Sequence, residues 1–108
     1  MLTHLTPTAL ARIRAIAAER AQLLVRGNTS IEPLTARLEQ AIEALPAAAQ
    51  SELMALAWVA QVEPVPAWGV LLEHAHAATD ASTPWSLASK LSLDTLIERG
   101  LQVLESQA

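Results

Sequence analysis

Side chains with metal-ligand chemistry gather in one segment of this 108-residue chain, residues 73–80, which read EHAHAATD. Glu73 and His76 have the Glu-x-x-His spacing that helical di-iron proteins use, and Asp80 follows one helical turn later. On a continuous helix the three side chains fall within roughly 60° of one another, so they can approach one ion. This sector faces away from the apolar side of the helix, and the sequence has no second Glu-x-x-His. We therefore weigh a metal-binding or small-ligand-binding protein against a solvated helix face.

Other catalytic chemistry has little support in the sequence. The chain has no cysteine, which excludes disulfides, thiolate ligands and thiol nucleophiles. Ser30, Ser82 and Ser92 precede predicted helices, where serine is typical as a cap. The three glycines are far apart and do not form a phosphate-binding loop. We predict no enzyme, no catalytic residue and no cofactor.

Composition favours an all-α fold. Hydrophobic residues make up 52% of the chain, and most of them are alanine and leucine, which are strong helix formers. Phe and Tyr are absent from the sequence, and the β-branched and aromatic residues that strands prefer are few. We predict one domain, residues 1–108, built as a small bundle of five to six helices with short connections.

Caps, prolines and glycines divide the chain into helices. Thr6-Pro7 is typical of a helix start, and Gly27-Asn28 is typical of a helix end. Proline at position 46 separates two helices, and a stiff joint with two prolines occupies residues 63–66. The predicted helices span residues 7–26, 31–45, 46–62, 67–79, a short segment from 85, and 92–105.

Residues 53–60, LMALAWVA, form an unbroken apolar run. At about 100° per residue such a run has no polar face, so this helix must be enclosed on all sides, and it is too short to span a membrane. With a mean hydropathy of +0.29, the chain has more apolar helix than we expect one small bundle to cover. We therefore predict a protein-interaction or structural module that binds a protein partner, most simply a second copy in a homodimer. The predicted interface residues are Arg20, Leu38, Ile42, Met54 and Trp58.

Some residues on the apolar sides of the predicted helices are unusual for a simple hydrophobic core. Arg20 lies in the middle of the apolar side of the first helix, so we expect it to reach water or to meet a carboxylate across the bundle or a dimer contact. Gly100 lies on the apolar side of the last helix at a propensity cost of about 1 kcal/mol, which predicts a close helix crossing. Trp58 and Trp68 either fill the core or line a small-ligand pocket.

Charge is distributed unevenly along the chain. Residues 1–30 contain four arginines and one glutamate, whereas the remainder contains three basic and ten acidic residues. The net charge of -4 disfavours nucleic acid as a partner, because phosphate binding needs a basic surface. The basic first helix either lies against the acidic body or acts as a regulatory module that docks on an acidic partner or an anionic membrane surface. Without a secretory signal or a membrane span, we expect a cytoplasmic location.

The chain from Leu45 onward resembles a known family. The likeness rests on Leu45-Pro46, on QSELMALAW at residues 50–58, on Trp68 and on residues 87–101. These residues resemble a family of short, mainly proteobacterial helical proteins that is catalogued as a domain of unknown function, over roughly residues 45–104. A basic turn that is common in that family after the Trp-containing helix is replaced here by residues 60–64, AQVEP. The resemblance implies a helical fold and implies no activity.

Overall fold

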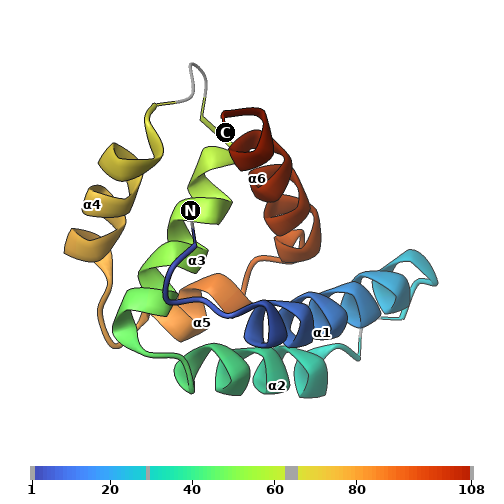
Figure 1. Cartoon of the computed structure of the whole chain (residues 1–108). Helices are drawn as coiled ribbons and strands as arrows, with labels where there is room; N and C mark the ends of the chain where they lie inside the picture. The colour runs from blue at the N-terminus through green and yellow to red at the C-terminus, as the bar shows by residue number, and fades with distance from the viewer. Residues whose placement is uncertain (1, 29, 63–65, 108) are drawn as a thin grey trace.

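The computed structural model describes residues 2–28, 30–62 and 66–107. Within these ranges it contains six α-helices and no strand, which confirms the predicted all-α bundle with short connections (Figure 1). The helices are α1 (Pro7–Val25), α2 (Glu32–Glu43), α3 (Ala47–Val59), α4 (Trp68–Ala78), α5 (Thr83–Ala88) and α6 (Leu93–Gln107). The joint predicted at residues 63–66 lies, apart from Pro66, outside the described residues.

The ends of α1 are made by the residues predicted to make them. Thr6 has an extended backbone, and its hydroxyl oxygen accepts a hydrogen bond from the amide of Ala9 at 3.2 Å. Gly27 has a φ of +79°, a left-handed conformation that side chains disfavour, and it ends the helix. The chain then reverses, so that α1 and α2 pack side by side as an antiparallel hairpin (Figure 1).

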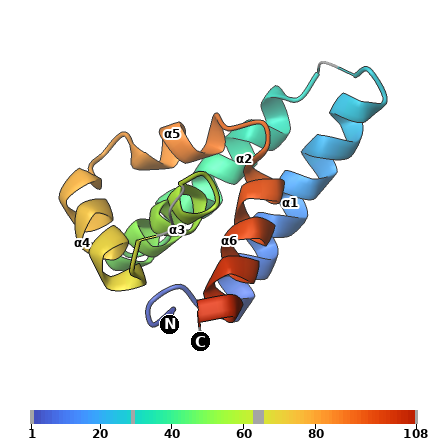
Figure 2. The same ribbon diagram turned by 90° about the horizontal axis from the view of Figure 1, so that it is seen from above.

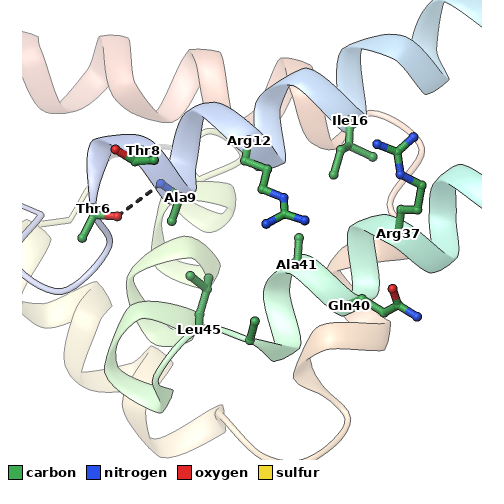
Figure 3. Close-up of a pocket in the computed structure, with 10 residues that line it drawn as sticks. Thr6, Thr8, Ala9, Arg12, Ile16, Arg37, Gln40, Ala41 and Leu45 are labelled. Carbon is green, nitrogen blue, oxygen red and sulfur yellow. Dashed lines mark hydrogen bonds between the residues drawn. The ribbon is translucent and has the colours of Figure 1, made fainter.

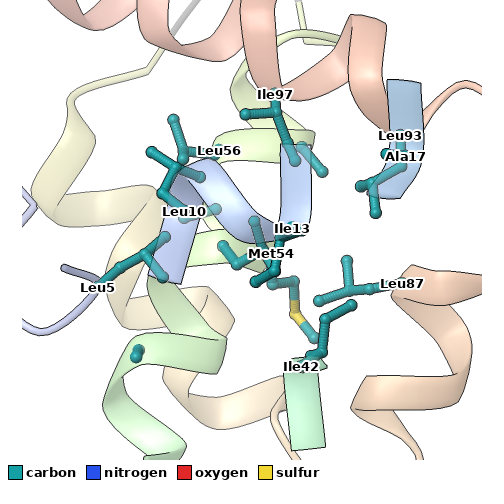
Figure 4. Packing of buried hydrophobic residues seen from close by; sticks show 14 of the residues in the cluster. Leu5, Leu10, Ile13, Ala17, Ile42, Met54, Leu56, Leu87, Leu93 and Ile97 are labelled. Atoms are coloured by element: carbon teal, nitrogen blue, oxygen red, sulfur yellow. The ribbon is translucent and has the colours of Figure 1, made fainter. Parts of the chain in front are cut away.

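α3 is the central helix of the fold. α4 and α6 pack on either side of it, and α5 packs against α2 and against α3 (Figures 1 and 2). α6 also packs against α1. Apolar side chains of the α1–α2 hairpin reach the same core, including Leu10, Ile13 and Ile42 (Figure 4). All six helices therefore contribute to one continuous core.

The prediction that the apolar run is enclosed is confirmed. Every residue from Ala49 to Ala57 is buried, and Leu53 and Leu56 are 0% exposed. The enclosure comes from other helices of the same chain, because α3 packs against α4, α5 and α6. The expectation that a second copy is needed to cover this helix is therefore wrong.

Gly100 lies at the crossing of α6 and α3, as predicted. A β-carbon built at position 100 would lie 2.4 Å from the backbone oxygen of Leu56 and 3.1 Å from its carbonyl carbon. Because the neighbour is backbone rather than a flexible side chain, it cannot move aside cheaply. The absence of a side chain at Gly100 allows α6 to approach α3 this closely.

Replacing Gly100 by alanine is expected to lower the free energy of unfolding by about 2 kcal/mol, because overpacking at the crossing outweighs the gain in helix propensity. Gly69→Ala is the matched control, since a β-carbon at Gly69 in α4 meets nothing within 4 Å. Urea unfolding of both variants measures the difference. A Gly100→Ala protein as stable as the control would contradict the close crossing.

Candidate functional site

The three residues predicted as metal ligands do not form a site. α4 ends at Ala78, and Thr79 is extended with ψ 128°, so Asp80 leaves the helical face that carries Glu73 and His76. Asp80 accepts hydrogen bonds from the hydroxyl and the amide of Ser82, which lower the pKa of its carboxyl group. In the part of the chain that the structure describes, no three His, Asp or Glu side chains can hold one ion. The predicted metal site is wrong because the helix stops too early.

The residues predicted at an interface lie mostly inside the chain. Arg20, Leu38 and Ile42 are 0% exposed, and Met54 is 8% exposed. Trp58 is partly buried and packs against the core. These side chains are already covered by their own chain, so an interface made through them is wrong. A contact with another protein has to use other residues.

Arg20 is buried and does not reach water, contrary to one predicted alternative; no described carboxylate lies within ion-pair distance of it, but the charge of Asp94 across the bundle in α6 acts on it. Its guanidinium donates hydrogen bonds to the carbonyl oxygens of Ala88 and Lys90 and, at 3.0 Å, to the hydroxyl of Thr35. Ala88 is the last residue of α5, where carbonyl groups lack partners within the helix. Burial lowers the pKa of Arg20 and the charge of Asp94 opposes this, but a guanidinium keeps its proton in proteins. Arg20 therefore caps α5 with a positive charge.

Glu52 is a second buried ionisable residue, 0% exposed in α3. Its carboxylate accepts hydrogen bonds from the amides of Thr3, His4 and Leu5 at 2.9–3.2 Å and from the Thr3 hydroxyl at 2.9 Å. Burial by itself raises the pKa of Glu52, but these hydrogen bonds lower it further than burial raises it. The pKa therefore lies below its usual value, and the charged carboxylate ties the N-terminal segment to α3.

Both buried charges have structural roles. The groups bonded to Arg20 and Glu52 are mainly backbone carbonyls and amides, so neither side chain faces a space where a substrate can reach it. Our interpretation of the sequence missed Glu52, although one signal was present. Glu52 directly precedes the apolar run of an enclosed helix, and a buried carboxylate needs hydrogen-bond donors from elsewhere in the chain.

A groove of about 490 Å³ lies between α1 and α2, and we call it the α1–α2 groove (Figure 3). Arg12 of α1 and Arg37 of α2 extend into the space between the two helices (Figure 3). Arg37 lies 3.9 Å from the carboxylate of Glu19, and both side chains are about 60% exposed, so this pair is weak. The other lining residues are small, apolar or uncharged polar: Thr6, Thr8, Ala9, Ile16, Gln40, Ala41, Ala44 and Leu45.

A second surface lies on the side of α1 next to α6, and we call it the α1–α6 face. Its centre is a row of exposed residues at alternating spacings of four and three: Ala11, Ala15, Ala18, Gln22 and Val25. Val25, at the end of the row, is 88% exposed. Two shallow depressions of about 390 and 320 Å³ follow the row, and their linings include Arg14, Arg26, Asp94 and Glu98. The face thus combines small side chains with charges of both signs.

The tryptophans divide between core and surface. Trp58 and Trp68 are partly buried and pack against the core. Trp85 of α5 is 65% exposed. Core packing is therefore the role that the structure favours for Trp58 and Trp68.

Comparison of the chain with models of protein families, with curated proteins and with solved structures found no match. The resemblance of residues 45–104 to a helical bacterial family, and the prediction that the chain is not an enzyme, therefore stay predictions. No helix among the described residues has the length and apolar character needed to cross a bilayer.

Replacing Glu52 by glutamine is expected to lower the free energy of unfolding by about 2 kcal/mol at neutral pH, because a neutral amide binds the three backbone amides more weakly. Urea unfolding measures this loss, and hydrogen exchange at Thr3, His4 and Leu5 measures the release of the N-terminal segment. Glu105→Gln, at an exposed position of α6, is the control. Equal stability of the two variants would contradict the role of Glu52.

The contribution of Glu52 depends on pH with a definite sign. The folded chain holds the pKa of Glu52 below the reference value of 4.5 that applies to the unfolded chain. The stabilisation is therefore complete above about pH 4.5 and is lost as the pH falls through the folded pKa. Asp80 shifts in the same direction but is present in both proteins, so the difference between wild type and Glu52→Gln isolates Glu52. Urea unfolding from neutral pH downward should show a difference that shrinks only below that value.

Replacing Arg20 by methionine is expected to destabilise the chain by about 3 kcal/mol, because the buried carbonyl group of Ala88 loses its donor and that of Lys90 keeps only the amide of Leu93. Arg20→Lys should lose less, since an ammonium group can still donate to one of the two carbonyls. Thermal and urea unfolding rank the two variants. A methionine variant as stable as the lysine variant would show that hydrogen bonding at the end of α5 contributes little.

Proposed function

We propose that this chain is a protein-interaction module that associates with a second copy of itself through the α1–α6 face. The observation that supports this most directly is the exposed row from Ala11 to Val25, which the chain's other helices leave uncovered. The homodimer remains as predicted, but its contact moves from Arg20, Leu38, Ile42, Met54 and Trp58 to the exposed α1–α6 face. The proposal also includes a cytoplasmic location, with which a cysteine-free composition agrees.

The spacing of the row matches the seam of a helix pair. Residues alternately four and three positions apart stay on one side of a helix, as the a and d residues of a coiled coil do. The core-facing side of α1 has the same alternation, in Leu10, Ile13, Ala17 and Arg20. α1 therefore has one seam that its own chain covers and a second seam that faces solvent. Alanine at three positions of the second seam allows close approach of another helix.

The charges on the face favour an antiparallel contact about a two-fold axis near Ala18. Glu98 and Arg14 line the depression beside Ala11 and Ala15, Arg26 lines the depression beside Val25, and Asp94 lines both. An antiparallel pairing places the Ala11 end of the row in one copy against the Val25 end in the other copy. Glu98 of one copy then lies near Arg26 of the other. Symmetry repeats this contact at the other end of the face. A single pair of helices buries a modest area, which fits a transient dimer.

The proposal assigns no reaction to the chain. The two buried ionisable side chains, Arg20 and Glu52, are held by backbone groups and are inaccessible to a substrate. Among the exposed residues, the predicted ligands Glu73, His76 and Asp80 are not brought together. These ionisable side chains therefore either stabilise the fold, as Arg20 and Glu52 do, or lie apart from one another on the surface.

Sedimentation at micromolar concentrations is expected to give a concentration-dependent shift from the chain mass of 11.5 kDa toward twice that value. Ala18→Glu should abolish the shift, because two carboxylates would face each other at the two-fold axis and each would lie near Asp94. Ala36→Glu, at an exposed position of α2 outside both surfaces, is the matched control and should leave it unchanged.

The charge pairs give an independent check. Glu98→Arg and Arg26→Glu should each weaken association, and the two changes together should restore it, because the reversed pair has the same attraction. A wild-type chain that sediments as a monomer over the whole range would disprove self-association. Dimers that persist in Ala18→Glu would show that another surface makes the contact.

A further inference from the structure

We propose that the α1–α2 groove binds an acidic amphipathic segment of a partner protein. This binding site goes beyond self-association and uses a different side of α1, so neither proposal depends on the other. The groove is the largest of the depressions described above, at about 490 Å³. Its lining combines two guanidinium groups with a floor of small and apolar side chains.

The charge of the groove selects an acidic occupant. Arg12 and Arg37 come from facing helices and extend into the space between them (Figure 3). None of the described residues that line the groove has a carboxylate. The nearest competitor is Glu19, whose 3.9 Å contact with Arg37 is exposed and therefore easily exchanged for a carboxylate of a ligand. Each guanidinium can bind a carboxylate through two parallel hydrogen bonds, which adds geometric selectivity.

The floor of the groove selects an amphipathic occupant rather than a simple anion. Ala9, Ile16, Ala41 and Leu45 line it, and all except the buried Ile16 are half-buried. These residues offer apolar surface to one or two side chains of a ligand. Small residues between two antiparallel helices leave room for a third helix, which is how many grooves bind amphipathic segments.

The rest of the chain argues against other anionic partners. Ten of the eleven acidic residues lie after residue 30, and the net charge is -4, so a long polyanion would meet repulsion outside the groove. An acidic peptide segment is short enough to contact the two arginines without crossing the acidic body. The chemistry of the groove therefore fits a protein segment with carboxylates on both sides of an apolar stripe.

Fluorescence anisotropy with two labelled helical peptides tests the proposal. One peptide contains alanine, leucine and glutamate, with the glutamates flanking a leucine stripe, and the other has glutamine in place of every glutamate. The wild-type chain should bind the glutamate peptide at least about tenfold more tightly, and added salt should weaken that binding. Equal binding of the two peptides, or no binding of the acidic one, would overturn the proposal.

Variants then locate the site. Arg12→Ala combined with Arg37→Ala should weaken binding of the acidic peptide at least about tenfold. Lys90→Ala combined with Arg99→Ala removes the same charge from outside the groove and outside the α1–α6 face, and should change binding less than about twofold. Ala44→Glu places a carboxylate in the groove and should also block binding, whereas Ala36→Glu on the same helix should not. All these positions are exposed except the half-buried Lys90, so we expect every variant to fold, and circular dichroism checks this.

Two outcomes would assign the groove differently. If both double variants lose affinity equally, binding follows net charge alone and the groove is not the site. If a single-stranded oligonucleotide or vesicles with anionic lipid displace the acidic peptide from the wild-type chain but not from the Arg12/Arg37 variant, the groove binds phosphate and the proposed occupant is wrong. Anisotropy of the acidic peptide with the Ala18→Glu variant separates groove binding from self-association, because position 18 does not line the groove: binding should be unchanged in this variant.

Discussion

The structure depends on one constraint, which is that the middle of α3, from Ala49 to Ala57, has no side facing solvent. All nine residues from Ala49 to Ala57 are buried, so every polar group on this helix needs a partner within the chain, and every neighbouring helix must fit closely. Glu52 obtains its partners from the amides of Thr3, His4 and Leu5, which fixes the N-terminal segment on the core. Gly100 gives α6 room beside the backbone of Leu56. The path of the chain before α1 and the position of α6 both follow from enclosing α3.

The buried charges of Arg20 and Glu52 are stabilised by hydrogen bonds to backbone groups, and the two side chains do not pair with each other. Arg20 donates to the carbonyl groups at the end of α5, where a helix has unpaired acceptors, and Glu52 accepts from consecutive amides before α1. Several hydrogen bonds keep each side chain ionised in the interior, and the negative charge of Asp94 adds to this at Arg20. Such an arrangement stabilises a particular set of neighbours rather than a reactive group. It leaves the surface, and α1 above all, as the part of the molecule that can recognise another protein.

Sequence patterns predicted the helices well and the surroundings of the charges poorly. Local signals such as Thr6-Pro7, Gly27 and Pro46 act within one or two turns, and every predicted helix was present. Glu52 and Arg20 depend on contacts with residues far along the chain, so no local pattern identified their partners. The metal prediction failed for a related reason, since it assumed that the helix continued to Asp80, but the extended Thr79 ended it. The burial of α3 was predicted correctly. The helices that bury it were not, because a single sequence does not say whether they belong to the same chain or to a second copy.

The position of α1 explains why both proposed contacts involve it. Its core-facing side is fixed by Leu10, Ile13 and Arg20, while α2 packs on one flank and α6 on the other. Each flank leaves a depression, and the two differ in chemistry: Arg12 and Arg37 make one basic, whereas Arg14 and Glu98 give the other both signs. A surface with both signs can pair with its own copy, but a surface with one sign repels its copy and needs an oppositely charged partner. The same helix can therefore take part in two contacts without competition, because the occupant of one flank does not cover the other.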